Sequence, residues 1–498
     1  MQYVQRRLHL SIRERRRSVA RLPNRSSSPA DGSPPCSVTP RGTVGIGRAT
    51  LGLMAAHSTS PTPTVPDRVS VEAHIQRLRQ VLDPALRSRT TETLLLGPPS
   101  DHGLQRVTTG RISAAEVRAP LALPGFDNSQ MDGFALRCAD VPEQEKPFML
   151  PLAGVVPAGT AAPDLPVGEC LAVMTGAPIP NGADVVIPVE KTAEGFAVLD
   201  SAAAGRKVSI HFTDSTGSDT QPGKFIRRAG SDVALGELIL RPRDVLTAAK
   251  LALLASCGIA QVEVLQRVRT LVLATGQELR RPGEPLGEGQ LYDANATLIR
   301  AVCEGFGHTV TTAVIASDAP AEFQSALDTL ITQHQPQLIV TAGGISAGAY
   351  EVVRQALAER GVHFGSVAQQ PGGPQGWGVL ESETGPAALV ALPGNPVSCA
   401  VSLETLVRPA LHGLDPVCPP QRRIQVTAGE HLTSPLGVRQ FRRVELKTQD
   451  DGATTTALTI GGPSSHLLGH LARAHALLEL REDDTEVPVG AQREAILL

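Results

Sequence analysis

Residues 338–350 read LIVTAGGISAGAY, and this stretch decides the fold. Its β-branched run, IVT, is typical of a buried strand and leads directly into Gly343-Gly344. A helix-forming pattern begins just past Gly348. The stretch therefore predicts a strand, a glycine turn and a helix N-terminus, an arrangement whose free backbone N–H groups hold anions in α/β proteins.

Two similar turns lie near this stretch in the sequence. Thr275-Gly276 ends one apolar run, and Gly394-Asn395 ends another. Three strand-to-turn units predict a ligand crevice at the carboxyl ends of parallel strands in a doubly wound α/β domain. Helical patterns alternate with the strands at βαβ spacing, and we expect helices at residues 294–305, 320–333, 350–360 and 397–411.

The composition is that of a multidomain protein with a large core. The chain has 498 residues, of which 41% are hydrophobic. No stretch approaches the roughly 20 apolar residues that a membrane-spanning helix needs, so we expect no membrane association. The seven cysteines are scattered without a CxxC pair, which favours a reducing, cytoplasmic location over a zinc ribbon or a disulfide framework.

The charge distribution argues against nucleic-acid binding. The net charge is −3, but the first 50 residues hold ten Arg and only two acids, so the rest of the chain is distinctly acidic. Aromatic residues make up only 3% of the chain, which leaves few surfaces on which bases stack. We therefore expect no nucleic-acid partner.

Residues 1–66 are rich in Arg, Ser, Pro and Gly without a sustained apolar period, so we predict a disordered N-terminal extension. Its Arg-rich, acid-poor opening also suits a transit peptide. We favour a simple tail or an upstream extension of the reading frame, because Met54 precedes a Ser/Thr/Pro-rich linker. Order is expected to begin at Ser70, a favourable N-cap for the helical pattern that follows.

The remaining chain divides into four predicted domains of mixed α/β and β class. Short β patterns separated by Gly/Pro turns indicate two small β domains, and a helical pattern is expected at residues 244–256 of the first domain. The predicted boundaries are 67–146 with 226–266 for an elongated helical and linker domain I, 147–225 for a β-rich domain II, 267–415 for the α/β domain III, and 421–498 for a C-terminal β-barrel domain IV.

Four acids stand at predicted turns or strand ends of the α/β domain. Glu278 lies in the first turn, Asp318 follows the second strand, and Glu351 begins the helix after the third. In a doubly wound sheet these three carboxylates would converge beside a phosphate site, which suggests Mg²⁺. Asp293 also precedes a helix, and we assign it the more usual role of a cap.

The sequence at residues 344–348, GISAG, matches the GxSxG pattern of a hydrolase nucleophile elbow. Ser346 would be the nucleophile, with His363 or His412 as nominal bases. We favour phosphate and hydroxyl binding instead, because two sister turns accompany it. In the third turn Asn395 suits an N-cap position, and Ser398 lies near free N–H groups in the first turn of the helix.

Polar residues also gather in three loops outside the α/β domain. Asp132 belongs to a segment of side-chain acceptors between Phe126 and Phe134, Thr175 lies in a Met-Thr-Gly turn, and Asp232 lies in a Gly-Ser-Asp turn. Each loop is weak evidence when taken alone. The first is the most indicative of function, because apolar anchors bound a dense run of acceptors.

Six motifs together resemble one family, the molybdopterin molybdenumtransferases, which comprise the bacterial MoeA proteins and the E domain of gephyrin. The resemblance covers about residues 70–498. In chain order the motifs are PGFDNSQMDGFALR (124–137), AVMTGAPIPNGADVVI (172–187), RRAGSDV (227–233), ATGQEL with PLGEGQLYDAN (274–279 and 285–295), TAGGISAGAYE (341–351) and ALPGNPVSCAV (391–401).

The resemblance implies an elongated four-domain subunit with a MogA-like domain III, in a homodimer whose active site lies between domain III of one subunit and domain II of the other. It implies Mg²⁺-assisted conversion of adenylyl-molybdopterin and molybdate to molybdenum cofactor and AMP. A molybdopterin adenylyltransferase and molybdoenzyme apoproteins are implied partners. A non-catalytic pterin-binding or scaffold protein of the same fold is the alternative.

By matching motifs, the resemblance also implies the site residues. The implied catalytic acids are Asp132, Asp232, Glu278, Asp318 and Glu351, and the last three of these would bind the metal. The implied substrate and phosphate contacts are Thr175, Thr275, Gly276, Gly343, Gly344, Ser346, Gly394, Asn395 and Ser398.

Three motifs depart from the family pattern. Many members have KPGKP where this chain reads QPGGP at residues 370–374, so two cations near the expected oxyanion site are replaced by Gln370 and Gly373. The family motif GDEL is GQEL here, and GDYD is GAYE. Arg227 and Arg228 are candidates to replace the lost positive charge.

Overall fold

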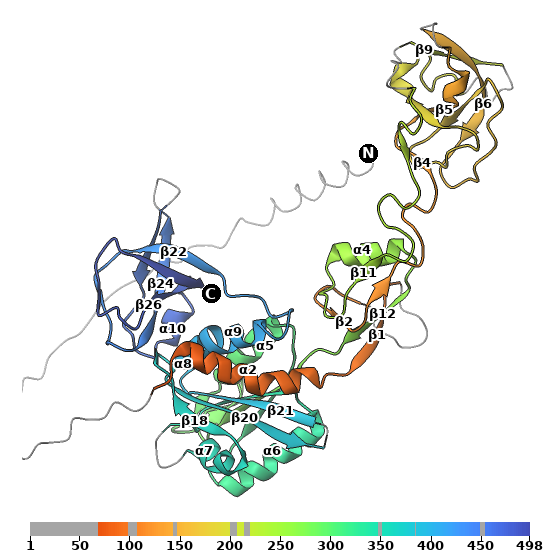
Figure 1. Cartoon of the computed structure of the whole chain (residues 1–498). Helices are drawn as coiled ribbons and strands as arrows, with labels where there is room; N and C mark the ends of the chain where they lie inside the picture. The colour runs from red at the N-terminus through yellow and green to blue at the C-terminus, as the bar shows by residue number, and fades with distance from the viewer. Residues whose placement is uncertain are drawn as a thin grey trace, which may run out of the picture. The chain divides into compact units, whose positions relative to one another are not determined.

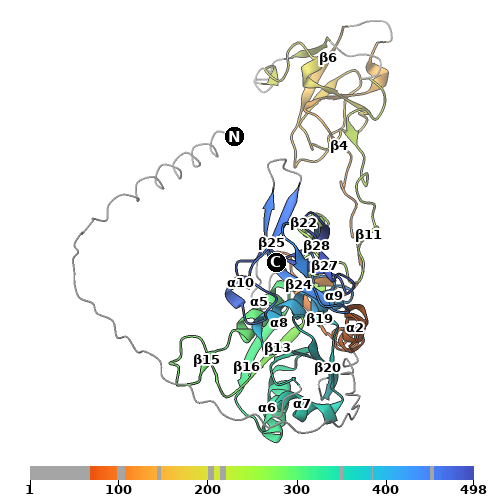
Figure 2. The same ribbon diagram turned by 90° about the vertical axis from the view of Figure 1, so that its left-hand side faces the viewer.

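The computed structural model describes residues 68–97, 107–142, 147–199, 207–213, 220–346, 351–383, 385–448 and 454–498 (Figures 1 and 2). The predicted extension at residues 1–66 lies outside these described residues, as do Ala347 and Gly348 of the GISAG motif. Among the described residues, no helix has the length and apolar character needed to cross a membrane.

A six-stranded sheet forms the centre of the α/β domain, in the order β16-β13-β17-β21-β20-β18. The first four strands are parallel, and β20 and β18 are antiparallel. The doubly wound prediction is therefore confirmed. The strands are β13 (Arg269–Thr275), β16 (Thr309–Ile315), β17 (Leu338–Ala342), β18 (His363–Ser366), β20 (Pro374–Ser382) and β21 (Gly385–Leu392).

Helices cover both faces of this sheet (Figure 1), because alternate side chains of each buried strand point to opposite sides. In β13, Val272 and Ala274 join one core cluster, whereas Leu271 and Leu273 join the other. The first face carries α5 (Asn295–Gly305), α8 (Pro396–Ser402), the π-helix η4 (Leu403–Val407) and α9 (Arg408–His412); the second carries α6 (Pro320–His334) and α7 (Val352–Leu357), which continues into η3 (Ala358–Arg360).

The first described helix, α2 (Val71–Arg87), belongs to this α/β core. Ser70 caps it as predicted, since its hydroxyl accepts a hydrogen bond from the Ala73 N–H at 3.1 Å. Leu78 and Leu82 are fully buried in the cluster that contains the strands of the sheet. The apolar face of this helix, which lies in the stretch predicted as the start of domain I, therefore packs on the α/β domain.

The β-rich domain is a five-stranded sheet in the order β8-β5-β7-β6-β9. Strand β5, which precedes the predicted boundary at residue 147, lies between β8 and β7 in this sheet. Gly133 allows the close pairing, because a Cβ atom there would overlap the Ile187 carbonyl. The elements are β5 (Gly133–Leu136), η1 (Cys138–Asp140), β6 (Phe148–Val156), β7 (Cys170–Val173), β8 (Val185–Pro188), η2 (Val189–Lys191) and β9 (Ser209–Phe212).

Strand pairs join two distant stretches of the chain on either side of the β-rich domain: β1 pairs with β12, β3 with β11 and β4 with β10. The helix α4 begins at Ala248 rather than Asp244, because the Thr247 side chain caps it by accepting from the Lys250 N–H. The elements are β1 (Thr91–Leu95), β2 (Ile112–Ser113), β3 (Val117–Arg118), β4 (Asn128–Ser129), β10 (Ile226–Arg227), β11 (Leu238–Leu240), α4 (Ala248–Ser256) and β12 (Gln261–Leu265).

The C-terminal domain is a closed five-stranded barrel, as predicted, in which β24-β25-β22-β28-β26 returns to β24. The short strand β19 (Gln369–Gln370) of the α/β region pairs with β24 from outside the ring. The elements are β22 (Arg423–Ala428), β23 (Leu432–Thr433), β24 (Arg439–Thr448), β25 (Thr455–Thr459), α10 (Leu468–Leu471), β26 (Ala476–Leu480), β27 (Glu486–Val487) and β28 (Gln492–Leu497).

Candidate functional site

The three predicted turns meet at the carboxyl ends of the neighbouring strands β13, β17 and β21. The Gly343 N–H donates to the Leu392 carbonyl at 3.1 Å, which joins the second turn to the third strand. A Cβ atom added to Gly394 would lie 3.2 Å from the Cα of Gly343, and one added to Gly343 would lie 3.3 Å from the Thr275 Oγ1. Residues 275–278, 343–346 and 393–398 therefore form one continuous surface, which we call the turn cluster.

The glycines of the turn cluster leave backbone donors free. No described residue accepts a hydrogen bond from the N–H of Gly276, Gly344 or Gly394. Gly343 and Gly344 have φ angles of 96° and 66°, which disfavour other residues. A Cβ atom on Gly344 would also lie 3.1 Å from the Val353 backbone nitrogen. Such unpaired N–H groups at a sheet edge suit an anionic oxygen.

The third turn begins helix α8 as predicted. The Asn395 side chain caps the helix by accepting from the Val397 N–H at 3.3 Å, and Ser398 is buried in the first turn. From helix α5, the Asn295 side-chain amide donates to the Gly394 carbonyl at 2.7 Å. The turn is thus fixed from two sides, and its N–H groups are presented in one orientation.

The segment that differs from the family pattern, which we call the 369–374 loop, lies against α8. A Cβ atom on Gly372 would lie 2.6 Å from the Ser402 hydroxyl oxygen and 3.2 Å from the Ser398 carbonyl oxygen. The Gln370 side-chain oxygen accepts from the Gln440 amide of the barrel at 2.6 Å. The side chain that replaces the first family lysine is therefore held by a neutral partner.

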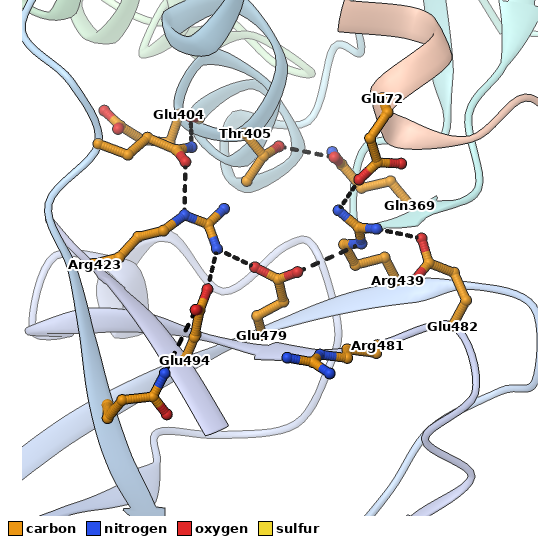
Figure 3. Close-up of polar contacts among 12 residues, drawn as sticks. Glu72, Gln369, Glu404, Thr405, Arg423, Arg439, Glu479, Arg481, Glu482 and Glu494 are labelled. Atoms are coloured by element: carbon orange, nitrogen blue, oxygen red, sulfur yellow. Dashed lines mark hydrogen bonds and ion pairs between the residues drawn. The ribbon is translucent and has the colours of Figure 1, made fainter. Parts of the chain in front are cut away.

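An ion network anchors the 369–374 loop between α2 and the barrel (Figure 3). Arg439 of β24 pairs with Glu72 at 2.7 Å and Glu482 at 2.8 Å, and its backbone N–H donates to the Ala368 carbonyl. Glu479 lies between the guanidinium groups of Arg439 and Arg423. Burial lowers the pKa of Arg439, but its acidic partners outweigh this effect and raise the pKa overall.

The three predicted metal ligands stand at the same end of the sheet. A Cβ atom on Gly276 would overlap the Glu278 carboxylate, so Glu278 folds back over the first turn. Asp318 is exposed after β16, and Glu351 precedes α7. Among the described residues, no three His, Cys, Asp or Glu side chains have the spacing of a metal site. A magnesium ion would need substrate oxygens to complete its ligand set.

Asp293 is the cap that the sequence predicted. Its Oδ1 accepts a hydrogen bond from the Ala296 N–H at 2.9 Å, and only 5% of the residue is exposed. This bond satisfies a donor in the first turn of α5.

Asp132 and Thr175 come together in the β-rich domain. The Asp132 Oδ1 accepts from the Thr175 N–H at 2.6 Å and from its hydroxyl at 2.8 Å. These hydrogen bonds lower the pKa of the Asp132 carboxyl, and the bond from the Thr175 backbone N–H has the largest effect. The carboxylate form is therefore favoured. Among the described residues, no hydrogen bond or ion pair joins this pair to the turn cluster.

The third loop holds Asp232 and the two candidate replacement arginines. Asp232 is exposed, and its backbone N–H donates to the Leu123 carbonyl. Arg228 donates to Asp127 at 2.5 Å, and Asp127 also accepts from the Ala229 N–H. Arg228 is therefore already paired within this region, whereas Arg227 has an exposed side chain on β10.

A serine hydrolase triad is not present at Ser346 among the described residues. The Nδ1 of His412 contacts the Cys418 carbonyl at 2.7 Å, and His363 lies against the Trp377 ring with the centroids 5.9 Å apart. Neither ring contacts Ser346, whose carbonyl is approached by the Arg354 guanidinium at 3.5 Å. The nucleophile interpretation of the GxSxG pattern is therefore not supported.

Three supporting residues escaped the sequence analysis: Asn295, Ser402 and Gln440. The position of Asn295 could have indicated its role, because it directly follows residue 294, the expected start of a helix. Ser402 and Gln440 had none, because each acts on a segment that is distant in the sequence: the Gln375 amide donates to the Ser402 hydroxyl at 2.8 Å, and Gln440 holds Gln370.

Three family models match the chain in order. Residues 69–258 match the MoeA N-terminal region (domain I and II), residues 271–413 match the "Probable molybdopterin binding domain", and residues 425–498 match the MoeA C-terminal region (domain IV). The matches span nearly all of the described chain.

Curated relatives and solved structures agree with these models. Molybdopterin molybdenumtransferase 2 of Mycobacterium tuberculosis (strain CDC 1551) is 41% identical over 77% of this chain and 91% of its own length. The molybdopterin molybdenumtransferase of Haemophilus influenzae is 31% identical over 82% of this chain and 96% of its own length. The crystal structure of a molybdopterin biosynthesis MoeA protein from Pyrococcus horikoshii has the same fold, with a TM-score of 0.65 at 22% identity, over 87% of this chain and 100% of that one.

Proposed function

Because the chain belongs to the MoeA family of molybdenum cofactor biosynthesis, we propose that it is a molybdenum insertase that converts adenylyl-molybdopterin and molybdate to molybdenum cofactor and AMP. The observation that carries this proposal is the contact between Gly343 and Gly394, which unites three glycine turns with free N–H groups at one sheet edge. A phosphate-linked substrate needs such fixed donors where negative charge develops during cleavage.

In this proposal the turn cluster holds the phosphate groups of the substrate. The N–H groups of Gly276, Gly344 and Gly394 donate to phosphate oxygens, and the hydroxyls of Thr275, Ser346 and Ser398 add further donors. Asn395 holds the third turn through its cap. Fixed backbone dipoles stabilise the leaving AMP without reorganisation.

Magnesium belongs to the proposal as an ion that binds together with the substrate. It would neutralise phosphate charge, with Glu278 as the nearest carboxylate and Asp318 and Glu351 as the other candidates. Support comes from the position of all three acids at the ends of neighbouring elements. The free protein offers no complete ligand set among its described residues, so metal affinity should depend on substrate.

Asp132, Thr175 and Asp232 complete the proposed catalytic set from the domains that precede the α/β domain. We retain the homodimer with an inter-subunit site and the cytoplasmic location as parts of this proposal. The support is that Asp132 accepts two hydrogen bonds from Thr175, which favour its carboxylate form, while neither residue bonds to a described residue of the turn cluster.

A scaffold without catalysis is the second candidate, because the 369–374 loop carries Gln370 and Gly373 in place of cations. One assay separates the candidates: the chain is supplied with adenylyl-molybdopterin, Mg²⁺ and molybdate, and AMP release is followed together with active cofactor formation. An insertase releases AMP and forms cofactor. Substrate binding without AMP release would overturn the insertase in favour of the scaffold, and ester hydrolysis lost in Ser346→Ala would favour a hydrolase.

A further inference from the structure

Three segments that connect the α/β domain to the rest of the chain meet around one small cavity. They are residues 88–90 between α2 and β1, residues 266–268 between β12 and β13, and residues 413–422 between α9 and β22. Arg89, Arg267 and Asp415, one from each segment, line this cavity of about 10 Å³, which we call the joint cavity. A cavity of this size holds a single water-sized species.

The lining of the joint cavity is rich in positive charge. Arg89, Arg111 and Arg267 line it, and Asp415 is the one carboxylate among the described lining residues. Outside the lining, Glu92 pairs with Arg111. Among the described residues, these three cations and two carboxylates leave one positive charge without a counterion. An uncompensated charge at a buried site is unfavourable, so the cavity favours an anion over a neutral molecule.

Arg89 carries a donor that lacks a partner. Its Nε donates to the Leu86 carbonyl at 3.0 Å, and its Nη1 donates to Asp415 at 3.0 Å. Its Nη2 is buried, and no described residue accepts a hydrogen bond from it. Only 8% of Arg89 is exposed, so bulk water does not solvate this group. A buried guanidinium N–H without an acceptor is costly unless a bound species accepts from it.

The electrostatics around Arg89 point in the same direction. Burial lowers the pKa of Arg89, and the positive charge of Arg243 lowers it further, although Asp415 acts the other way. Burial and the charge of Arg89 also lower the pKa of His308 to about 3, so this ring is neutral at pH 7. An anion beside Arg89 would relieve the excess of positive charge.

The shape of the joint cavity limits which anion fits. Gly307 and Val417 both line it, and a Cβ atom added to Gly307 would lie 2.6 Å from the Val417 Cγ1. The same Cβ atom would lie 3.7 Å from the Arg267 Nη1, which donates to the Gly307 carbonyl at 3.0 Å. A polyatomic anion such as phosphate or molybdate has no room in this space, whereas a single spherical ion fits.

We propose that the joint cavity binds one chloride ion, which accepts from the Arg89 Nη2 and balances the excess charge of Arg89, Arg111 and Arg267. The ion ties the three connecting segments together and so fixes the α/β domain to its neighbours in the chain. This site is independent of the proposed reaction. A buried water molecule is the competing occupant, because it fits the same space but leaves the charge uncompensated.

The test compares thermal unfolding of the full chain in sodium chloride and in sodium gluconate at equal ionic strength. Gluconate is too large for the cavity, and a ligand that binds only the folded state raises the unfolding midpoint with its concentration. Above saturation, we expect the midpoint to rise by about 4 °C for each tenfold increase in chloride and to stay constant in gluconate. In crystals soaked in sodium bromide, an anomalous-scattering peak should contact the Arg89 Nη2.

Arg89→Lys is the informative variant, because an ammonium group keeps the charge opposite Asp415 but loses the fork of N–H donors. It should raise the chloride concentration needed for a given shift at least about tenfold. Arg87→Lys is the matched control, since the Arg87 side chain is 75% exposed at the end of the same helix, and it should leave the chloride dependence unchanged. Val417→Ile adds one methyl group to the wall and should abolish the dependence without removing a charge.

Equal midpoints in chloride and gluconate would overturn the proposal and assign the cavity to water. The absence of a bromide peak beside Arg89 would overturn it as well. A chloride effect of the same size in wild type and in Val417→Ile would show that the ion acts elsewhere, and this comparison holds even if Arg89→Lys does not fold.

Discussion

Two walls of the candidate site are built by different means. The turn cluster presents backbone groups, and the N–H groups of Gly276, Gly344 and Gly394 donate to no described residue. The 369–374 loop is made of side chains, and the barrel holds it through Gln440 and the Arg439 network. A backbone wall keeps its chemistry when nearby side chains change, whereas a side-chain wall changes charge with a single substitution. The second wall carries Gln370 and Gly373, two uncharged residues.

The strongest test of the backbone wall is Gly344→Ala. Its φ angle of 66° is strained for alanine, and the new Cβ atom would lie 2.8 Å from the Val353 Cγ2. We expect AMP release to fall roughly 10²–10³-fold, as when an oxyanion donor is lost. The measurement is single-turnover AMP release.

The matched control for this substitution is Gly361→Ala at the end of η3. Gly361 has a similar φ angle of 81°, but no atom lies within 4 Å of the added Cβ. It should lower the free energy of unfolding by about 1 kcal/mol and leave turnover unchanged. Equal turnover in both variants would show that the second turn does not hold the phosphate.

The next largest effect is expected for Glu278→Gln, which removes a charge but keeps the shape of the first turn. If Glu278 binds the metal, AMP release should fall roughly 100-fold while substrate affinity changes much less. Glu288→Gln is the control, an exposed acid of the loop between β14 (Leu279–Arg280) and β15 (Leu291–Tyr292). Equal losses of binding and turnover, or no loss of either, would remove the metal assignment.

Arg439→Met tests how the side-chain wall is anchored. Because Arg439 is largely buried and pairs with Glu72, Glu479 and Glu482, its loss should cost about 2 kcal/mol of unfolding free energy. Arg87→Met is the control, since that side chain is 75% exposed and its pair with Asp83 contributes little. Thermal unfolding measures both. A similar shift for the two variants would mean that the network does not secure the loop.

The smallest expected effect is a gain, from Gly373→Lys. An added Cβ atom would meet its neighbours at 3.5 Å, so the fold tolerates the change. One charged hydrogen bond contributes about 1.5–3 kcal/mol, and we expect molybdate to bind at least about tenfold more tightly by calorimetry. Gly373→Gln controls for side-chain length. An equal gain with glutamine would show that charge in this loop is not what limits oxyanion binding.

Local signals were sufficient for much of the fold. Ser70 and Asn395 were predicted as caps, and both accept the expected backbone N–H. The strands of the central sheet followed from short apolar runs that end in glycine. These features depend on residues close in the sequence, and the turn cluster was predictable because topology alone brings strand ends together.

The features that could not be predicted depend on contacts between distant residues. The helix α2 lies in the stretch predicted as domain I, yet its buried Leu78 packs on the α/β core. The strand β5 belongs to the β-rich sheet because Gly133 permits close approach to Ile187. The neutral pair Gln370–Gln440 joins a loop to a barrel strand, and no local pattern indicates it. Likewise, the three acids share a sheet end, and no pattern in the sequence shows that, among the described residues, no three His, Cys, Asp or Glu side chains are grouped as in a metal site.

The most direct test of the central claim is the stoichiometry of a single turnover. The chain is loaded with adenylyl-molybdopterin, molybdate and Mg²⁺ are added, and AMP and active cofactor are counted in the same sample. A turn cluster that holds the phosphates of an insertase predicts one AMP per cofactor formed, with neither product in the absence of molybdate. Bound substrate that yields no AMP, or AMP without cofactor, would contradict it.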